Sequence, residues 1–488
     1  MSFTPRFVRV LSLVFAGTTI VHLIGFVRQA GVAAYFGLGR DLDIYLLVLA
    51  LATATAFAFA NIFDTVAVPR LSRIRQEAGE SGFRMAAGLF LLLALAAALA
   101  GAAAFKLAIP LLLPFAAPGF SPEEVQRAVS LVNWFLPWSI LSLLQLALGS
   151  LHRVSSRMGR VIASELVSGV VSCVSIFAWH PQVEAIAVAY AAGCAAGILV
   201  LLPGLRTGLR TSAPLPRHTI SGTLRNVGEL FVAHQAGAAC RIVERALLTL
   251  LPAGSIAAWG YAALISGTVT SLLSFRDAFL QPLSAAENRA ERLERALCGL
   301  MLLAVPAAGF MAVAAVPLLT VALERGAFDA NATAQSAVFL AAQALTVPGT
   351  VVTVIVTRMF LVLDRNWLLL AYFLANLIGI ALLGTVTIIF LGLGVMGFAL
   401  AILLNTYAST VVACLLLHRT GLRPRWYRVL QFGAGASVLA ALGAVLAHLA
   451  GSTLPALAAL PVMAIVYALP VALGYYSARA QLRQIVAG

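Results

Sequence analysis

The chain has 488 residues, of which 61% are hydrophobic and only 10% are charged, and its mean hydropathy is +0.99. Its apolar runs repeatedly reach the roughly 20 residues needed to cross a bilayer, and the polar stretches between them are too short to fold alone. This composition predicts an all-α polytopic membrane protein and excludes a soluble catalytic domain. The net charge of +14 lies in loops between the apolar runs, so we interpret it as a topology signal and expect no nucleic-acid partner.

About fourteen transmembrane spans are predicted from the apolar runs and their polar flanks. In chain order they cover residues 7–27, 44–68, 85–112, 128–151, 161–179, 183–204, 227–251, 255–275, 296–322, 336–362, 367–391, 394–417, 428–449 and 455–476. With the N-terminus in the cytoplasm, most of the 32 lysines and arginines fall in cytoplasmic loops, whereas the opposite loops keep only Arg40, Arg127 and Arg325. This asymmetry predicts an even number of spans with both termini in the cytoplasm.

A weak internal repeat divides the chain into two halves. Residues 63–72 resemble residues 275–284 with one insertion, and Ser121 to Glu124 predicts a helix start that Asp329 repeats in the second half. Parallel six-span halves are typical of transporters, in which the substrate lies between two lobes. We therefore predict an N-lobe at 1–205 with spans 1–6, a C-lobe at 226–418 with spans 7–12, and two additional C-terminal spans at 428–476.

The first hairpin carries ionisable residues where a membrane protein rarely has them. Arg28 ends the first predicted span, and Asp43 lies in the loop before the second. Such groups at or near bilayer depth cost a few kcal/mol each and tend to mark a substrate path, so both are candidates for substrate binding. The alternative is a pair of solvated residues that reach the membrane interface. His22, inside the first span, is either a packing histidine or a coupling or gating residue.

Span 7 is the second polar helix. His234, Arg241 and Arg245 are spaced by seven and four residues, so they share one helical face and could line a substrate path as a cationic stripe. Glu244 is spaced to pair with Arg241, and the alternative is a neutralised network that holds the two lobes together. Glu244 and Glu165, an acidic residue inside span 5, are candidates for coupling or gating, although Glu165 is equally consistent with a buried neutral carboxyl.

Motifs for enzymatic chemistry are not found in the sequence. It has no P-loop, no zinc-ligand spacing and no nucleophile-elbow motif, and its five cysteines show no metal-binding pattern. We therefore expect no catalytic residue, no metal site and no enzyme activity. Two dissimilar lobes with buried cations favour alternating access over a channel.

Several short stretches, taken in order, resemble the lipid II flippase family (MurJ, also called MviN) of the multidrug/oligosaccharidyl-lipid/polysaccharide exporter superfamily. Each stretch is weak alone, but their joint order is specific and covers the chain from about residue 8 to its end. The stretches are Gly25-Phe26-Val27-Arg28 with Phe36-Gly37-Leu38-Gly39 and Asp43, Pro69-Arg70-Leu71-Ser72, Leu251-Pro252-Ala253-Gly254-Ser255-Ile256 with Tyr261-Ala262, and Leu323-Glu324-Arg325-Gly326-Ala327-Phe328.

The resemblance implies two six-helix lobes around a cationic cavity that receives the diphosphate and sugars of an undecaprenyl-linked precursor. It also implies that the two additional C-terminal helices form a groove for the lipid tail. By motif, Arg28 is implied to bind the diphosphate, and Asp43 to position the substrate or to gate its path. This chain has His22 where the family commonly has an arginine, and Leu264 where a basic residue is usual. Arg241 and Arg245 are candidates to supply the missing charge.

The resulting prediction is a flippase of the bacterial cytoplasmic (inner) membrane that moves either lipid II or a polysaccharide repeat unit. The expected partners are the lipid-linked oligosaccharide, membrane lipids and glycan-assembly enzymes. No cofactor is expected, and coupling to the membrane potential or to a monovalent ion stays an open alternative. Two other functions also remain open: a cation-coupled efflux transporter that uses Glu165 and Asp43, and a nontransporting scaffold for glycan assembly.

Overall fold

The structure, a computed structural model, describes residues 5–62, 68–179, 182–203, 221–274, 288–363, 365–452 and 454–477. These described residues are almost entirely helical and include no strand, which confirms the all-α class. Eleven of the described helices are long and apolar enough to cross a membrane by length and composition. Helices α2, α8 and α9 coincide with three further predicted spans, so every predicted span corresponds to a helix.

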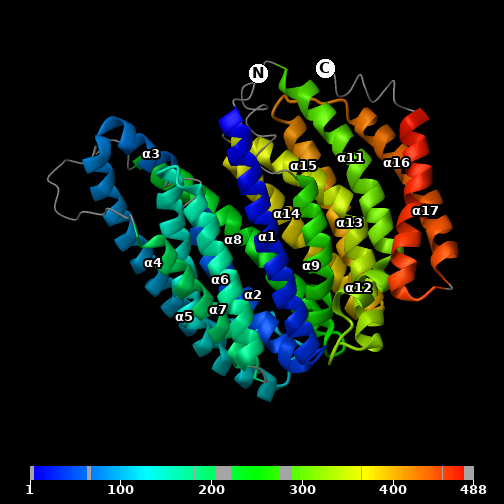
Figure 1. The fold of residues 1–488 in the computed structure, drawn as a ribbon, viewed down its shortest axis with the longest axis horizontal. Coiled ribbons are helices and arrows are strands. Elements are labelled where there is room, and N and C mark those ends of the chain that lie inside the picture. Colours follow the sequence, from blue (N-terminus) through cyan, green and yellow to red (C-terminus); the bar gives the residue numbers. More distant parts are fainter. Residues whose placement is uncertain are drawn as a thin grey trace. The chain divides into compact units, whose positions relative to one another are not determined.

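Contacts between Cα atoms group the chain into two compact units, residues 1–250 and 251–488. The helices of the first unit are α1 (Pro5–Phe36), α2 (Arg40–Ile62), α3 (Val68–Glu77), α4 (Gly79–Ala116), α5 (Pro122–Val154), α6 (Met158–Trp179), α7 (Val183–Leu201) and α8 (Ser221–Thr249) (Figure 1). This grouping places α8, the seventh predicted span, with the first unit. The predicted division into lobes of six spans stays a prediction.

The second unit contains the remaining helices. They are α9 (Ser255–Ser274), α11 (Arg289–Val313), α12 (Ala315–Leu323), α13 (Ala330–Val362), α14 (Asn366–Gly384), the π-helical turn η3 (Thr385–Phe390), α15 (Gly394–His418), α16 (Trp426–Gly451) and α17 (Ala456–Ser477). The two C-terminal helices pack against each other, and α16 also packs along α11. They are therefore part of the second unit and not a separate domain.

The internal repeat is visible in the packing of each unit. In the first, α5 packs against α2, α4 and α7; in the second, α13 packs against α9, α11 and α15. Ser121 caps α5 in a reciprocal capping box, and Asp329 caps α13 by accepting a hydrogen bond from the Ala332 N–H at 2.8 Å. Both helix starts were predicted. Residues 63–67 and 275–287, which include most of the repeated sequence, lie outside the described residues.

Two predicted boundaries in the first hairpin are wrong. Helix α1 continues through Arg28 to Phe36, so Arg28 lies about 12 Å before the end of the helix along its axis. Asp43 is in the first turn of α2, not in the loop, and is only 1% exposed. Both residues are therefore inside the folded unit. The polar stretch near residues 70–84, predicted as a short loop, instead forms α3 and the start of α4.

Small residues allow α6 and α7 to pack closely. A Cβ atom added at Gly193 would lie 2.5 Å from the Ser168 backbone oxygen and 3.0 Å from the Ser172 Cβ. We therefore expect Gly193→Ala to push the helices apart and to destabilise the unit by about 1–3 kcal/mol, as overpacking does. Thermal unfolding of the purified protein measures this, with Gly159→Ala as the control because a Cβ at Gly159 has nothing within 4 Å. Equal melting of the two variants would contradict the tight contact.

Candidate functional site

Arg28 is held against α6 and α7 inside the first unit. Its Nη1 atom donates a hydrogen bond to the Ser172 Oγ at 3.1 Å, and its guanidinium carbon lies 4.4 Å from the centre of the Tyr190 ring. The Nε atom of Arg28 is buried and has no hydrogen-bond partner. Gln29 donates a hydrogen bond to the Tyr190 hydroxyl at 3.2 Å, which orients the ring. The arginine is thus positioned by its neighbours and not free in solvent at a span end.

A row of aromatic side chains connects this arginine to helix α2. Tyr190 lies 6.3 Å from Trp138, Trp138 lies 6.0 Å from Phe135, and Phe135 lies 5.3 Å from Tyr45, measured between ring centroids. Tyr45 is two residues after Asp43 on α2. Because aromatic rings are rigid and pack densely, the row holds α2, α5 and α7 at a defined spacing. Arg28 and Asp43 therefore belong to one packed framework within the first unit.

Asp43 and Arg245 form the second charged group of this unit. Helix α8 packs against α2, and Arg245 interacts electrostatically with Glu244, Arg241 and Asp43. Two nitrogens of Arg245, Nε and Nη1, are buried without a hydrogen-bond partner. Buried donors are normally satisfied, and guanidinium N–H groups without a partner are strong donors for carboxylate or phosphate oxygens. This group can therefore accept an anion.

The other predicted site residues differ in their surroundings. His234 is half-buried on α8 and Arg241 is exposed, while Glu244 is half-buried and interacts electrostatically more strongly with Arg245 than with Arg241. The predicted helical face is present, because α8 runs unbroken from Ser221 to Thr249. His22 on α1 and Glu165 on α6 both have exposed side chains. Whether these residues bind, couple or gate stays a prediction.

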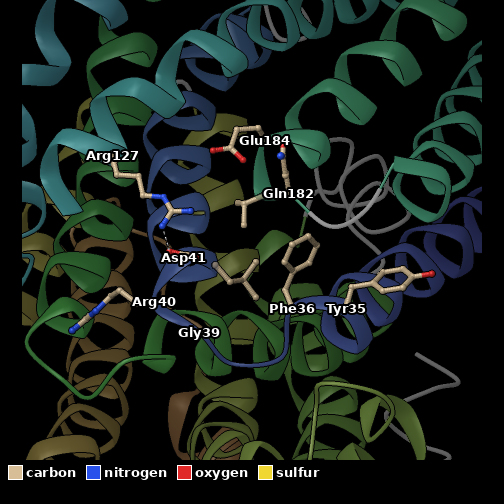
Figure 2. A pocket seen from close by; sticks show the side chains of 10 residues that line it. Tyr35, Phe36, Gly39, Arg40, Asp41, Arg127, Gln182 and Glu184 are labelled. Atoms are coloured by element: carbon tan, nitrogen blue, oxygen red, sulfur yellow. Dashed lines mark hydrogen bonds and ion pairs between the residues drawn. The ribbon is translucent and has the colours of Figure 1, made fainter. Parts of the chain in front are cut away.

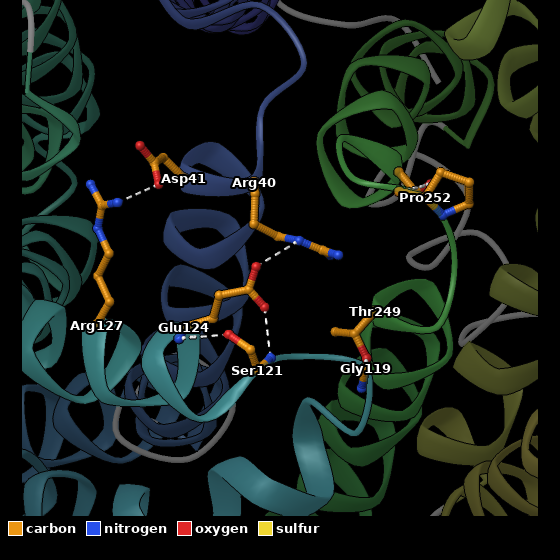
Figure 3. Close-up of polar contacts among 9 residues, drawn as sticks. Arg40, Asp41, Gly119, Ser121, Glu124, Arg127, Thr249 and Pro252 are labelled. Carbon is orange, nitrogen blue, oxygen red and sulfur yellow. Dashed lines mark hydrogen bonds and ion pairs between the residues drawn. The ribbon is translucent and has the colours of Figure 1, made fainter.

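A mixed-charge pocket of about 480 Å³ lies at the turn between α1 and α2. Figure 2 shows Arg127 reaching toward Asp41, with Gln182 and Glu184 from the start of α7 facing the same space. Arg127 bonds Asp41 at 2.5 Å and Arg40 bonds Glu124 at 3.0 Å, so the first turn of α2 is tied to the first turns of α5 (Figure 3). These ion pairs hold the turn of α2 that carries Asp43.

An apolar groove of about 1090 Å³ runs through the second unit between α11, α13, α15 and α16. Its few polar groups are satisfied within the protein: the Tyr407 hydroxyl donates to the Leu345 oxygen at 2.8 Å, and the Thr353 and Thr410 hydroxyls are 2.9 Å apart. On α16 the lining extends from Trp426 to Ala444, about 27 Å along the helix axis. The groove can therefore accept a long hydrocarbon chain.

The sequence profile of the family described as "Lipid II flippase MurJ" matches residues 32–467. The chain belongs to the MurJ lipid II flippase family. Its structure is similar to "Lipid II flippase MurJ, inward closed conformation", with a TM-score of 0.76, 16% sequence identity, and coverage of 95% of this chain and 99% of that chain. A search of the curated proteins returns no match.

The MurJ-like fold is shared with other transporters. An inward-facing multidrug resistance MATE family transporter of the MOP superfamily matches with a TM-score of 0.63 and 13% identity over 83% of this chain and 94% of that chain. A MOP superfamily transporter from Pyrococcus furiosus matches with a TM-score of 0.56 and 16% identity over 83% and 93%. The predicted family and the predicted multi-pass membrane fold are confirmed.

Several residues of the site were missed by the sequence analysis. Tyr190 and Ser172, which hold Arg28, lie in strongly apolar helices where a single hydroxyl has no pattern that distinguishes it. The pairing of Arg40 with Glu124 was equally invisible, because the two residues are far apart in sequence and come together only in the tertiary structure. Among the described residues, no group of three or more His, Cys, Asp or Glu side chains could hold a metal ion.

Proposed function

We propose that this protein translocates an undecaprenyl-diphosphate-linked glycan across the cytoplasmic membrane by alternating access. The observation that carries the proposal is Arg245, whose buried Nε and Nη1 atoms have no partner in a chain of the lipid II flippase family. A diphosphate-sugar head group cannot enter hydrocarbon without replacement of its hydration. Arginine can provide this replacement, because its planar fork binds phosphate oxygens through two hydrogen bonds at once.

The apolar groove supports a polyprenyl tail as the lipid part of the substrate. Its lining of about 27 Å along α16 is longer than one leaflet, which is about half of the ~30 Å hydrocarbon core. The acyl chain of an ordinary phospholipid ends near the middle of the bilayer, whereas a polyprenyl chain can follow the groove over its whole length. The tail would stay in an apolar environment while the head group crosses.

The proposal includes a topology and a driving force. Both termini lie in the cytoplasm, because the basic loops then obey the positive-inside rule. The membrane potential or a monovalent ion drives the cycle, and glycan-assembly enzymes use the translocated product. The glycan is either lipid II or a polysaccharide repeat unit, and these two cargoes are separated by a complementation experiment.

The experiment is growth rescue in a bacterium depleted of its own lipid II flippase, with expression of the protein in the membrane confirmed. Rescue by the wild-type chain establishes transport of the peptidoglycan precursor. A well-expressed chain that does not rescue transports another lipid-linked glycan, which restoration of surface polysaccharide in a strain lacking the corresponding flippase then tests. Failure in both strains would contradict the proposal.

The groove gives a separate prediction. Gly433 on α16 lines the groove, and a Cβ added there has nothing within 4 Å, so we expect Gly433→Phe to occupy groove space without a backbone clash. We expect this variant to lower the rescue strongly while its membrane abundance stays normal. Gly435→Phe is the matched control, because Gly435 is equally unobstructed but does not line the groove. Equal rescue by both variants would show that the tail does not use the groove.

A further inference from the structure

The connection between α15 and α16 lies at one end of the apolar groove. His418, the last residue of α15, and Trp426, the first residue of α16, both line the groove. The intervening residues 419–425, here called the mouth loop, must therefore cross the end of the groove. By the distribution of basic loops this end lies on the cytoplasmic side.

The mouth loop is strongly basic, and its three arginines make no ion-pair contact within the described residues. Arg419, Arg423 and Arg425 have exposed side chains, and none of them forms an ion pair with another residue of the described chain. The sequence contains no aspartate or glutamate after Asp364. On the neighbouring helix α11, Glu291 bonds Arg295 at 2.8 Å and also interacts electrostatically with Arg425, and Glu294 bonds Arg428 at 3.1 Å.

The loop is also held in a defined shape. The Gly421 N–H donates to the His418 oxygen at 3.2 Å, with Gly421 at a φ of +87° that glycine adopts readily. At the other end, Glu294, which is only 6% exposed, accepts the backbone N–H of Arg425 at 3.1 Å. Both ends of the loop are therefore fixed by hydrogen bonds, and the start of α16 is capped by the Glu294 carboxylate. The three arginine side chains remain exposed on this fixed loop.

We propose that the mouth loop is a loading site for the diphosphate of the polyprenyl-linked substrate, occupied while the polyprenyl chain enters the groove and before the head group is translocated. This inference rests on the proposed function. Charge complementarity supports it, because three exposed arginines without an ion-pair contact, beside an apolar groove, match a ligand with a multiply charged phosphate head and a long hydrocarbon chain. A singly charged phospholipid offers less charge and a chain shorter than the groove.

The test measures binding of three probes to the purified full-length protein by titration in native mass spectrometry. The probes are undecaprenyl diphosphate, undecaprenol and phosphatidylglycerol. The variant R419Q/R423Q/R425Q removes the charge of the mouth loop, and R70Q/R73Q/R75Q is the control that removes the same charge from the basic helix α3. We expect the mouth-loop variant to bind undecaprenyl diphosphate about tenfold or more weakly, the effect of losing one charge-assisted hydrogen bond. Its affinity for undecaprenol should be unchanged.

Each other outcome overturns the inference. Equal affinity of the mouth-loop and control variants for the diphosphate excludes a loading site at the loop. Equal loss of undecaprenol binding means that the mouth loop supports the polyprenyl chain and does not recognise the diphosphate, which contradicts the inference. An equal loss of phosphatidylglycerol binding means that the loop attracts anionic lipids in general. If the wild-type protein binds neither polyprenyl probe, the proposed function itself fails, which separates the two failures.

Discussion

Arg245→Ala is expected to abolish growth rescue while the protein remains in the membrane. Arg245 has two buried nitrogens without partners, and loss of a buried charged contact to the substrate costs about 2–5 kcal/mol, which corresponds to a loss of transport of about 30-fold or more. Arg245→Lys should recover only part of the activity, because lysine keeps the charge but not the two-pronged geometry. Flipping is measured in cells or vesicles and normalised to membrane abundance.

A structural role of Arg245 would give a different result. Arg245 interacts electrostatically with Asp43 and Glu244, so a single neutral substitution also leaves carboxylates uncompensated. The double variant Asp43→Asn/Arg245→Gln removes one charge of each sign and should fold normally, yet we expect it to remain inactive. If this double variant transports like the wild type, Arg245 only balances charge inside the unit. Arg73→Gln is the control, because Arg73 is an exposed arginine paired with Glu77 on α3.

Arg28→Ala is expected to reduce transport by about tenfold or more, and the residue that stacks on Arg28 should tune the effect. The Tyr190 ring lies 4.4 Å from the guanidinium carbon, and a cation–π contact contributes about 0.5–2 kcal/mol. Tyr190→Leu should therefore lower transport by about fivefold, the equivalent of about 1 kcal/mol. Tyr190→Phe keeps the ring and loses only the hydrogen bond from Gln29, so it should transport within about twofold of the wild type.

The order of these variants decides the role of Arg28. The order expected for a positioned substrate ligand is wild type, then Tyr190→Phe, then Tyr190→Leu, then Arg28→Ala, with similar thermal stability for all four. A drop in melting temperature that parallels the drop in transport would instead assign Arg28 to packing between α1, α6 and α7. Full activity of Arg28→Ala would contradict any role in transport.

The positions of most helices were predictable because they depend on local sequence. The predicted span 394–417 corresponds to α15 at Gly394–His418, and the predicted start at Ser121 is the cap of α5. Apolar length, capping side chains and prolines act within a few residues of each other, so one stretch of sequence contains the whole interaction. The family likewise followed from short motifs in a specific order, which the profile match over residues 32–467 confirms.

The placement of the charges and the shape of the groove were decided only by the tertiary structure. The sequence predicted Arg28 at the end of a span because a charged residue normally leaves the bilayer. Its position within α1 depends on contacts with Ser172 and Tyr190, which lie more than 140 residues away in sequence. The groove is equally hidden, since groove-lining and lipid-facing residues are both apolar and the sequence pattern does not distinguish them. Hydrophobicity places a residue in the membrane, whereas contacts between distant helices determine what it faces there.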